Sequence, residues 1–451
     1  MDAVRAAAAP LAPGERLPSV RELMRLHRAS PVTVQRAIAR LAAEGVVVPR
    51  PGRGTFVSDR ARPAATTDLS WQEIALPGPA LDTGGLDELM APARPGAFVL
   101  STGYMEPALQ PVAPLSAALA RAARRPGAWD RLPVEGLPEL RSWFARAAGG
   151  GLTGHDVVIC SGGQSALGTV FRALGAAGDA VLVESPTYGG ALAAARAAGL
   201  RPVAVPADGH GVRPELLAAA LGRTGARIVY AQPAFANPHG ATLAPARRTA
   251  IMAAVAAAGA FLVEDDWARD LVIDGVAPPP LVAEDPRGHV VHLRSLTKSA
   301  APGLRIAAVA ARGAAGTRLR AARVVDDFFV AGPLQHAALD LVSSPAWRSH
   351  QRRLRSGLRE RRDALVDALA RQLPQLELAC LPRGGFHLWA RLPDGSDDED
   401  VARRAAASGV VVSPGRRWFP GEAPGPYLRL TFAGEAPERM AEAIARLASV
   451  L

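Results

Sequence analysis

The stretch SLTKSAAPGLR, residues 295–305, contains Lys298, the only lysine in a chain with 52 lysine and arginine residues. Arginine replaces lysine in most roles that need a positive charge or hydrogen-bond donors. It cannot form an imine with an aldehyde, because that reaction needs an amine that loses its proton, and a guanidinium stays protonated. The single lysine is therefore either a chance survivor on the surface or a residue required for amine chemistry, and the surrounding motifs decide between the two.

Short apolar runs along the chain have the length and residue content of buried strands. Helical stretches rich in alanine and leucine separate most of them. This alternation predicts an α/β fold with a mostly parallel sheet covered by helices. The predicted strands are VVIC (157–160), VLVE (181–184), RIVY (227–230), FLVE (261–264) and VVHL (290–293).

A polar motif lies at or shortly after the end of each predicted strand. In open α/β sheets, ligands bind beyond the carboxyl ends of the strands, so these motifs are expected to line one crevice. Arg305, seven residues after Lys298, is a sixth member of the set. The five motifs are SGGQ, SPTY, NPHG, DDW and SLTK.

Each motif offers chemistry that suits one cofactor, pyridoxal 5′-phosphate. Lys298 can form the imine with its aldehyde, and Asp265 can hold its pyridine nitrogen protonated, which makes the ring an electron sink. Gly163 and Gln164 begin a predicted helix, whose first backbone amides favour a phosphate. We therefore predict that all four residues bind the cofactor, with Lys298 as the catalytic residue.

Four further residues complete the predicted cofactor site. Ser295 and Arg305 can bind the phosphate, Tyr188 can stack on the ring, and Asn237 can bind its phenolic oxygen. Taken singly, such residues have plainer interpretations, because a tyrosine more often packs than stacks and a Ser-Gly-Gly is usually a turn. The prediction rests on the complete set in this order.

The first 60 residues form a basic head with ten arginines against five acidic residues. Ser19 and Glu22 have the spacing of a capping box and predict a helix to about Arg28. A second helix is predicted from Ser30, as its N-cap, to a stop at Gly45. Its apolar positions should face a core and leave Thr33, Gln35, Arg36 and Arg40 outside.

Two short strands follow in VVVPRPGRGTFV, around a turn that carries Arg50 and Arg53. Two helices and a basic hairpin predict a winged helix-turn-helix with its second helix in the major groove of DNA. The alternative is a small solvated domain whose arginines serve solubility. The net charge of +10 also favours a polyanionic partner.

Beyond the head, residues 61–97 are rich in proline, glycine and small polar residues, which is typical of a linker with one short helix. The longest uncharged apolar run, residues 250–263, is too short to span a bilayer, and no signal peptide is evident. Two cysteines, Cys160 and Cys380, favour a reducing cytoplasm. No metal site is expected, because His289 and His292 would point to opposite faces of a strand.

The motifs PGERLPSVREL, SPVTVQRAIARLAAEG and GRGTFV resemble the DNA-binding domain of GntR-type bacterial regulators over nearly all of residues 10–58. Two departures are Pro31, where many relatives have an arginine, and a short first helix. The resemblance implies contacts with double-stranded operator DNA from Arg21, Ser30, Thr33, Gln35 and Arg53.

The motifs VEGLPELR, CSGGQSAL, VESPTYGG, NPHG, EDDW and SLTKSAAPGLR resemble fold type I aminotransferases over roughly residues 98–451. The resemblance implies a large cofactor-binding domain at 98–340 and a smaller C-terminal α+β domain at 341–451. It implies a mixed sheet in the large domain, in which one of the strands interpreted above as parallel is antiparallel. It also implies that Arg429 binds the α-carboxylate of an amino acid and that the site lies at a homodimer interface.

Three residues depart from the pattern of this family. Trp267 stands where relatives commonly have a tyrosine that tunes the cofactor. Arg131 stands where a tyrosine usually reaches the phosphate of the partner subunit, and His239 replaces the common threonine of the NPTG motif. These changes concern ring tuning and catalytic rate more than cofactor binding.

A GntR-like head fused through a linker to an aminotransferase-like body resembles the MocR branch of the GntR regulators. The resemblance implies a dimeric transcription regulator that senses either an amino compound or the cofactor itself. An amino compound would displace Lys298 from the cofactor. One alternative is an active aminotransferase of amino acids with a vestigial head. Another is a sensor that only stores the cofactor, which Arg429 disfavours because it suits a second ligand.

Overall fold

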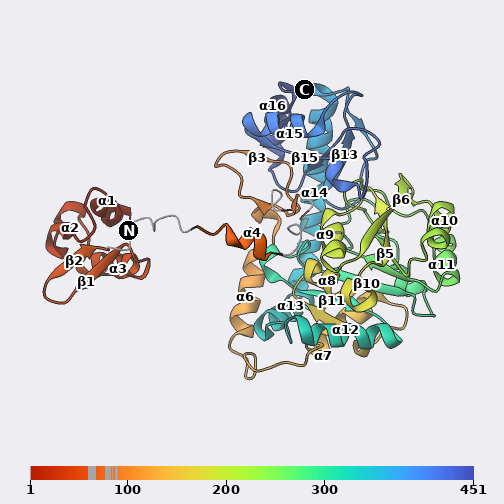
Figure 1. Ribbon diagram of the computed structural model, residues 1–451, viewed down its shortest axis with the longest axis horizontal. Helices are drawn as coiled ribbons and strands as arrows, with labels where there is room; N and C mark the ends of the chain where they lie inside the picture. Colours follow the sequence, from red (N-terminus) through yellow and green to blue (C-terminus); the bar gives the residue numbers. More distant parts are fainter. Residues whose placement is uncertain (1, 59–67, 77–82, 84, 87–89) are drawn as a thin grey trace. The chain divides into compact units, whose positions relative to one another are not determined.

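The computed structural model describes residues 2–58, 68–76, 83, 85, 86 and 90–451 (Figure 1). The chain divides into two compact units, Met1–Ala80 and Leu81–Leu451. Within the described residues, no helix is long and apolar enough to cross a membrane. The finer domain limits at residues 60, 97 and 340 stay predictions, and part of the predicted linker lies outside the described residues.

The N-terminal unit contains the predicted helices and hairpin. Ser19 and Glu22 cap the second helix reciprocally, and Ser30 Oγ accepts a hydrogen bond of 3.2 Å from the Thr33 amide at the start of the third. The two strands pair antiparallel, with Val47 opposite Val57. The elements are α1 (Asp2–Ala8), α2 (Val20–His27), α3 (Pro31–Ala43), β1 (Val47–Arg50), β2 (Gly54–Val57) and the short linker helix α4 (Trp71–Ala75).

A small core holds this unit together. Leu23 of α2 packs with Val34, Ile38 and Leu41 of α3, all of which are buried. Burial of these positions leaves the opposite side of α3 in solvent. The predicted division of α3 into a core face and an exposed face is therefore confirmed.

The centre of the second unit is a sheet in the order β4-β11-β10-β9-β8-β5-β6-β7. Of the predicted strands, β5, β8, β9 and β10 pair in parallel, and β4 pairs with β11. β11 is antiparallel to both of its neighbours, β6 is parallel to β5, and β7 is antiparallel to β6. A mostly parallel sheet is thus confirmed, but its antiparallel inner strand is β11 and not one of the predicted strands. The strands are β4 (Val157–Cys160), β5 (Ala180–Ser185), β6 (Arg201–Asp208), β7 (Gly211–Val212), β8 (Ile228–Ala231), β9 (Phe261–Asp265), β10 (Val290–Ser295) and β11 (Ala307–Ala310).

Helices cover both faces of this sheet because the strands are apolar on both sides. On β5, Leu182 belongs to one buried cluster, and its neighbours Val181 and Val183 belong to another. Residues of α7, α10, α11 and α13 pack in the first cluster, and residues of α8, α9 and α12 in the second. The helices are α6 (Val112–Ala122), α7 (Pro138–Ala148), α8 (Gly163–Leu174), α9 (Gly189–Ala197), α10 (Pro214–Thr224), α11 (Pro245–Ala257), α12 (Gly313–Asp326) and α13 (Gly332–Val342).

The C-terminal part has a second sheet, in the order β12-β13-β16-β15, which confirms the predicted α+β architecture. The short strand β3 (Phe98–Val99), at the start of the predicted large domain, pairs with β14 of this C-terminal part. The chain therefore touches the C-terminal part before it enters the large sheet. The elements are α14 (Pro345–Gln372), β12 (Glu377–Leu378), β13 (His387–Arg391), α15 (Asp398–Ala407), β14 (Val410–Val411), β15 (Ser413–Pro414), β16 (Tyr427–Thr431) and α16 (Pro437–Ala448).

Candidate cofactor site and DNA-binding face

One cavity collects every residue predicted to bind the cofactor or a carboxylate. Most of them lie at the carboxyl ends of the parallel strands, as expected for this type of sheet. Arg305 precedes β11, whose antiparallel direction brings its first residues to the same edge. Arg429 comes from β16 of the C-terminal part. The cavity is lined by Gly163, Gln164, Tyr188, Asn237, Asp265, Ser295, Lys298, Arg305 and Arg429 among others.

Lys298 is held at the wall of this cavity. Its Nζ donates a hydrogen bond of 2.9 Å to the Gly103 carbonyl and lies 3.9 Å from the ring centroid of Tyr104. Burial, with a further contribution from the Arg429 charge, lowers the pKa of Lys298 to about 7, although Asp265 opposes the shift. A large share of the amine is therefore unprotonated near neutral pH, which is the form that reacts with an aldehyde.

Asp265, at the end of β9, is fixed by two neighbours on β8 and the loop that follows it. The Tyr230 hydroxyl donates 2.7 Å to its Oδ2, and Gln232 Nε2 donates 2.8 Å to the same oxygen. Burial raises the pKa of Asp265, and the two hydrogen bonds partly offset that rise. Gln232 Oε1 in turn accepts a hydrogen bond of 2.9 Å from the backbone amide of Asn237. Gln232 therefore links Asp265 and Asn237, two of the predicted site residues.

The start of α8 has the form of an anion cradle. Gly163 and Gln164 are its first residues, and Arg305 Nη2 donates 2.9 Å to the carbonyl of Ser161, just before the helix. A Cβ atom on Gly162 would lie 2.6 Å from the guanidinium of Arg305. Glycine is thus required for the close approach, and a helix N-terminus with a nearby arginine suits a phosphate.

Tyr188 and Gln164 are joined across the cavity wall. The Tyr188 hydroxyl donates 3.1 Å to Gln164 Oε1, and Gln164 Nε2 donates 2.8 Å to the Gly190 carbonyl. Burial raises the pKa of Tyr188, so its hydroxyl stays protonated and serves as a donor. These bonds fix the tyrosine side chain at the cavity, as its predicted stacking role requires.

Arg429 is a buried cation, 2% exposed, without a carboxylate partner among the described residues. Its Nη2 donates to the Ser101 carbonyl, and its Nη1 donates 3.3 Å to Asn237 Oδ1. Its guanidinium carbon lies 4.2 Å from the ring centroid of Trp418. Burial lowers the pKa of Arg429 to about 9, because the charged form loses its hydration. Such a group strongly favours an anionic ligand.

The cavity also contains buried polar atoms that have no hydrogen-bond partner in the described part of the chain. They are Trp267 Nε1, Thr297 Oγ1, His387 Nδ1 and Arg429 Nε. Buried polar groups in proteins are nearly always paired, so this wall suits a polar ligand. Together with the cradle at α8 and the reactive amine, these atoms make the site fit a phosphorylated aldehyde cofactor and a small anion.

Sequence reasoning missed several residues of this wall. Tyr104, Tyr230, Gln232, His387 and Trp418 all line the cavity or bind a residue that does. Only Tyr230 and Gln232 carried a usable signal, because both lie at the carboxyl end of a predicted strand.

The three residues that depart from the family pattern lie in different places. Trp267 lines the cavity and stacks on His387, with ring centroids 5.8 Å apart. His239 is buried and lines a separate cavity with Cys380, while Arg131 is exposed. Of the three, only Trp267 is therefore placed to contact a cofactor within the same chain.

The five residues predicted to contact DNA are all exposed. The side chains of Arg21, Gln35 and Arg53 have no hydrogen-bond or ion-pair partner among the described residues. Ser30 and Thr33 are joined by their side-chain oxygens at 2.8 Å at the start of α3. Their roles stay predictions, and their exposure leaves them available to DNA.

The fold and the cavity define a chain with a winged helix-turn-helix unit and a fold type I aminotransferase unit. The family profile of class I and II aminotransferases matches residues 106–447, and that of the gntR family of bacterial regulatory proteins matches residues 7–57. The chain belongs to the class I and II aminotransferase family and carries a GntR-type DNA-binding domain. Pyridoxal 5′-phosphate is the cofactor of this aminotransferase family.

Similar proteins fall into two groups. The HTH-type transcriptional regulator YdcR of Escherichia coli is 29% identical over 449 residues, 97% of this chain and 95% of its own length. The regulator TauR of Rhodobacter capsulatus is 29% identical over 97% of this chain and 92% of its own. The 2-aminoadipate transaminase of Thermus thermophilus is 32% identical over 85% of this chain and 98% of its own.

Among solved structures, that of the α-aminoadipate aminotransferase LysN from Thermus thermophilus, in complex with N-(5′-phosphopyridoxyl)-L-leucine, is similar. Its TM-score is 0.76 at 30% identity, over 85% of this chain and 98% of that one. The regulators thus match nearly the whole chain, whereas the aminotransferases match a smaller part. This combination is that of GntR regulators of the MocR type.

Proposed function

We propose that this protein is a pyridoxal phosphate-dependent transcription regulator, in which the head binds operator DNA and the cavity senses an amino compound. The observation that carries the proposal is the coexistence of two candidate sites in one chain. The residues of the head that are predicted to contact DNA are exposed, and the cavity has a reactive lysine and a buried arginine that has no acidic partner among the described residues. The similarity of whole regulators supports the same conclusion.

In the cavity, bound cofactor would supply an aldehyde that reacts reversibly with amines and a ring that withdraws electrons. Lys298 would hold it covalently through Nζ and give way when the amine of a ligand takes that place. Asp265 would hold a proton on the pyridine nitrogen, since its own carboxylate is fixed by Tyr230 and Gln232. The first turn of α8 and Arg305 would bind the phosphate.

Arg429 would bind the carboxylate of the ligand, which makes an α-amino acid or a related amino acid the favoured class of effector. The guanidinium is already oriented by Ser101 and Asn237, so binding costs little side-chain entropy. A carboxylate would also neutralise a buried charge that has no acidic partner in the described part of the chain.

The protein is proposed to act as a homodimer. Asp326 and Asp327, at the end of α12, bind α8 residues and Ser161 close to the phosphate cradle. The apolar side chains of Val325 and Phe328 beside them are exposed in the single chain. A partner subunit that covers this surface would sense changes at the cradle, and a ligand favouring one dimer arrangement would alter the position of both heads.

The alternative, an active aminotransferase with a vestigial head, is favoured by one observation. Lys298, Asp265 and Arg429 line one cavity and suit amino group chemistry, and the chain is 32% identical to a transaminase over 85% of its length. Slow transamination is compatible with regulation, so activity alone does not separate the two functions.

DNA binding separates them. Fluorescence anisotropy of the cofactor-loaded protein with DNA from upstream of its own gene, in the presence of excess nonspecific competitor, tests the proposal. A regulator is expected to keep its specific complex. Loss of all binding to this DNA and to neighbouring promoters would favour the aminotransferase.

A further inference from the structure

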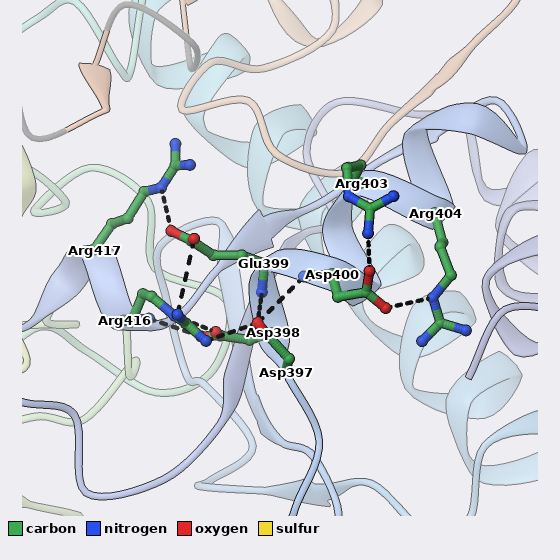
Figure 2. A network of polar contacts seen from close by, with 8 residues as sticks. All are labelled: Asp397, Asp398, Glu399, Asp400, Arg403, Arg404, Arg416 and Arg417. Carbon is green, nitrogen blue, oxygen red and sulfur yellow. Dashed lines mark hydrogen bonds and ion pairs between the residues drawn. The ribbon is translucent and has the colours of Figure 1, made fainter.

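A network of acidic and arginine side chains ties the turn η6 (Arg416–Trp418) to the start of α15 (Figure 2). Asp398, only 1% exposed, accepts 2.8 Å from the backbone amide of Arg416 and 2.6 Å from its Nε. Arg416 Nη2 donates 2.7 Å to Asp397. The turn is thus held by its backbone and its side chain together.

The sequence DDED at 397–400 explains the start of α15 but not this tie. Asp397 caps the helix by accepting from the amides of Glu399 and Asp400, at 3.0 and 3.3 Å. Acidic residues at a helix N-terminus are favoured in their own right. Asp398 is different because its two oxygens are directed to Arg416 rather than to the helix it belongs to.

The turn carries Trp418, which covers the buried arginine of the cofactor cavity. The Trp418 ring centroid lies 4.2 Å from the guanidinium carbon of Arg429. Trp418 Nε1 donates 3.1 Å to Ser413 Oγ, and the Trp418 carbonyl accepts 2.8 Å from the Thr187 amide. A cation held over a tryptophan face is attracted to the ring, so the ring fixes the guanidinium plane.

Trp418 is shared between two cavities. Trp418 lines the cofactor cavity and also a second cavity of about 600 Å3, whose other walls include Asp397, Glu399 and Ser413. The indole stands between the two cavities, is only 2% exposed, and packs with Trp389 and Phe419. The bonds from the turn to the buried Asp398 add to this packing in holding the ring over Arg429.

We propose that Asp398 and Arg416 are positioning residues for the carboxylate pocket, holding Trp418 against Arg429. The guanidinium is then presented to a ligand carboxylate in one orientation, without reorganisation on binding. This inference rests on the proposed role of Arg429 and adds a specificity determinant remote from the ligand.

The test compares Asp398→Asn with a matched control on the same helix, Asp400→Asn. Among the described residues, the Asp400 side chain pairs with the exposed Arg403 and Arg404, away from the turn (Figure 2). Cofactor-loaded, full-length protein is titrated with L-leucine and with 3-methylbutylamine, the same molecule without its carboxylate. The visible absorption of the bound cofactor reports binding of each ligand.

Asp398→Asn is expected to raise the apparent dissociation constant for L-leucine roughly tenfold, the loss typical of a charge-assisted hydrogen bond. Its affinity for the amine should stay within about twofold of that of the unmodified protein, which is the usual size of the effect of a surface substitution. Asp400→Asn should change neither. If Asp398→Asn fails to fold, Arg416→Gln removes the same side-chain contact from its exposed partner, which is 45% exposed.

Unchanged discrimination between the two ligands in Asp398→Asn would overturn the inference, and so would equal losses for both. If the unmodified protein does not distinguish them, the proposed role of Arg429 fails, and the inference fails with it. A second, independent measurement needs no ligand. The fluorescence emission of Trp418 is obtained by subtracting the spectrum of the same protein carrying Trp418→Phe. A red shift is expected in Asp398→Asn alone, and an unchanged emission would contradict the tie.

Discussion

The arginines of the two units of this chain that are predicted to bind ligands lie in different environments. In the head, the guanidinium groups of Arg21 and Arg53 are exposed and have no hydrogen-bond or ion-pair partner among the described residues. In the aminotransferase unit, Arg429 is buried, oriented by carbonyl and amide oxygens, and covered by an aromatic ring. Exposed guanidinium groups suit a long polyanion whose binding depends on salt, whereas a buried one suits a single small anion. The environment of the residue, and not its type, separates the predicted DNA site from the proposed effector site.

Lys298 is the exception to this use of arginine and gives the largest expected effect. Lys298→Ala should abolish the visible absorption of the cofactor bound through this residue, because no other lysine can replace the amine. Far-UV circular dichroism should show an intact fold. An unchanged visible spectrum would remove the basis of the cofactor assignment.

Arg429→Ala tests the buried cation. It should weaken binding of amino acids on the order of 100-fold, the scale of truncating a buried hydrogen-bonded charge pair, at both low and high salt. The resting spectrum of the bound cofactor should not change. Arg391→Ala, on the neighbouring strand β13, is the matched control because that arginine is partly exposed and pairs with Asp394. Persistence of the spectral response in Arg429→Ala would place the carboxylate elsewhere.

The pH dependence of cofactor binding follows from Lys298. Burial lowers its pKa to about 7, so the reactive amine increases as pH rises through 7. The rate at which the apoprotein takes up pyridoxal phosphate should therefore rise about tenfold between pH 6 and pH 8 and then level off. Stopped-flow absorbance measures this rate. A rate that climbs steadily to pH 10 would indicate a lysine with an ordinary pKa.

Arg53→Ala tests the exposed cations and has the smallest expected effect. DNA affinity should fall severalfold for all sequences, and the salt dependence should lose a slope of about 0.9 for each phosphate contact removed. Anisotropy at several salt concentrations measures both quantities. A loss confined to one DNA sequence would show that the wing reads bases instead of binding the backbone.

Much of the fold was predictable because the strands VVIC, VLVE, FLVE and VVHL are unbroken apolar runs. The strands that were missed have no such pattern. β6 contains Pro202 and Pro206 and is largely exposed, while β11 is three alanines and a valine, which could equally belong to a helix. The place of β11 in the sheet depends on pairing with the preceding strand β10 and with the distant strand β4, and local sequence does not encode that.

The candidate site shows the same division. Residues that follow strands, such as Asp265 and Lys298, were predictable because strand ends converge at one edge. Trp418 and His387 were not, because they come from the C-terminal part, from the turn η6 and from β13, and reach the cavity only through tertiary packing. The role of Asp398 could not be predicted from a sequence pattern, because this residue is connected to Arg429 only through the turn that carries Arg416 and Trp418.

The most direct test of the central claim is whether the cavity and the head are coupled. Anisotropy titrations on operator DNA should be run with the cofactor-loaded protein, with and without an amino acid that changes its visible spectrum. Coupling predicts a change in DNA affinity of about fivefold or more, the usual scale of allosteric coupling, and no change in Lys298→Ala. Identical DNA affinities with the ligand bound and absent would contradict the proposed regulator.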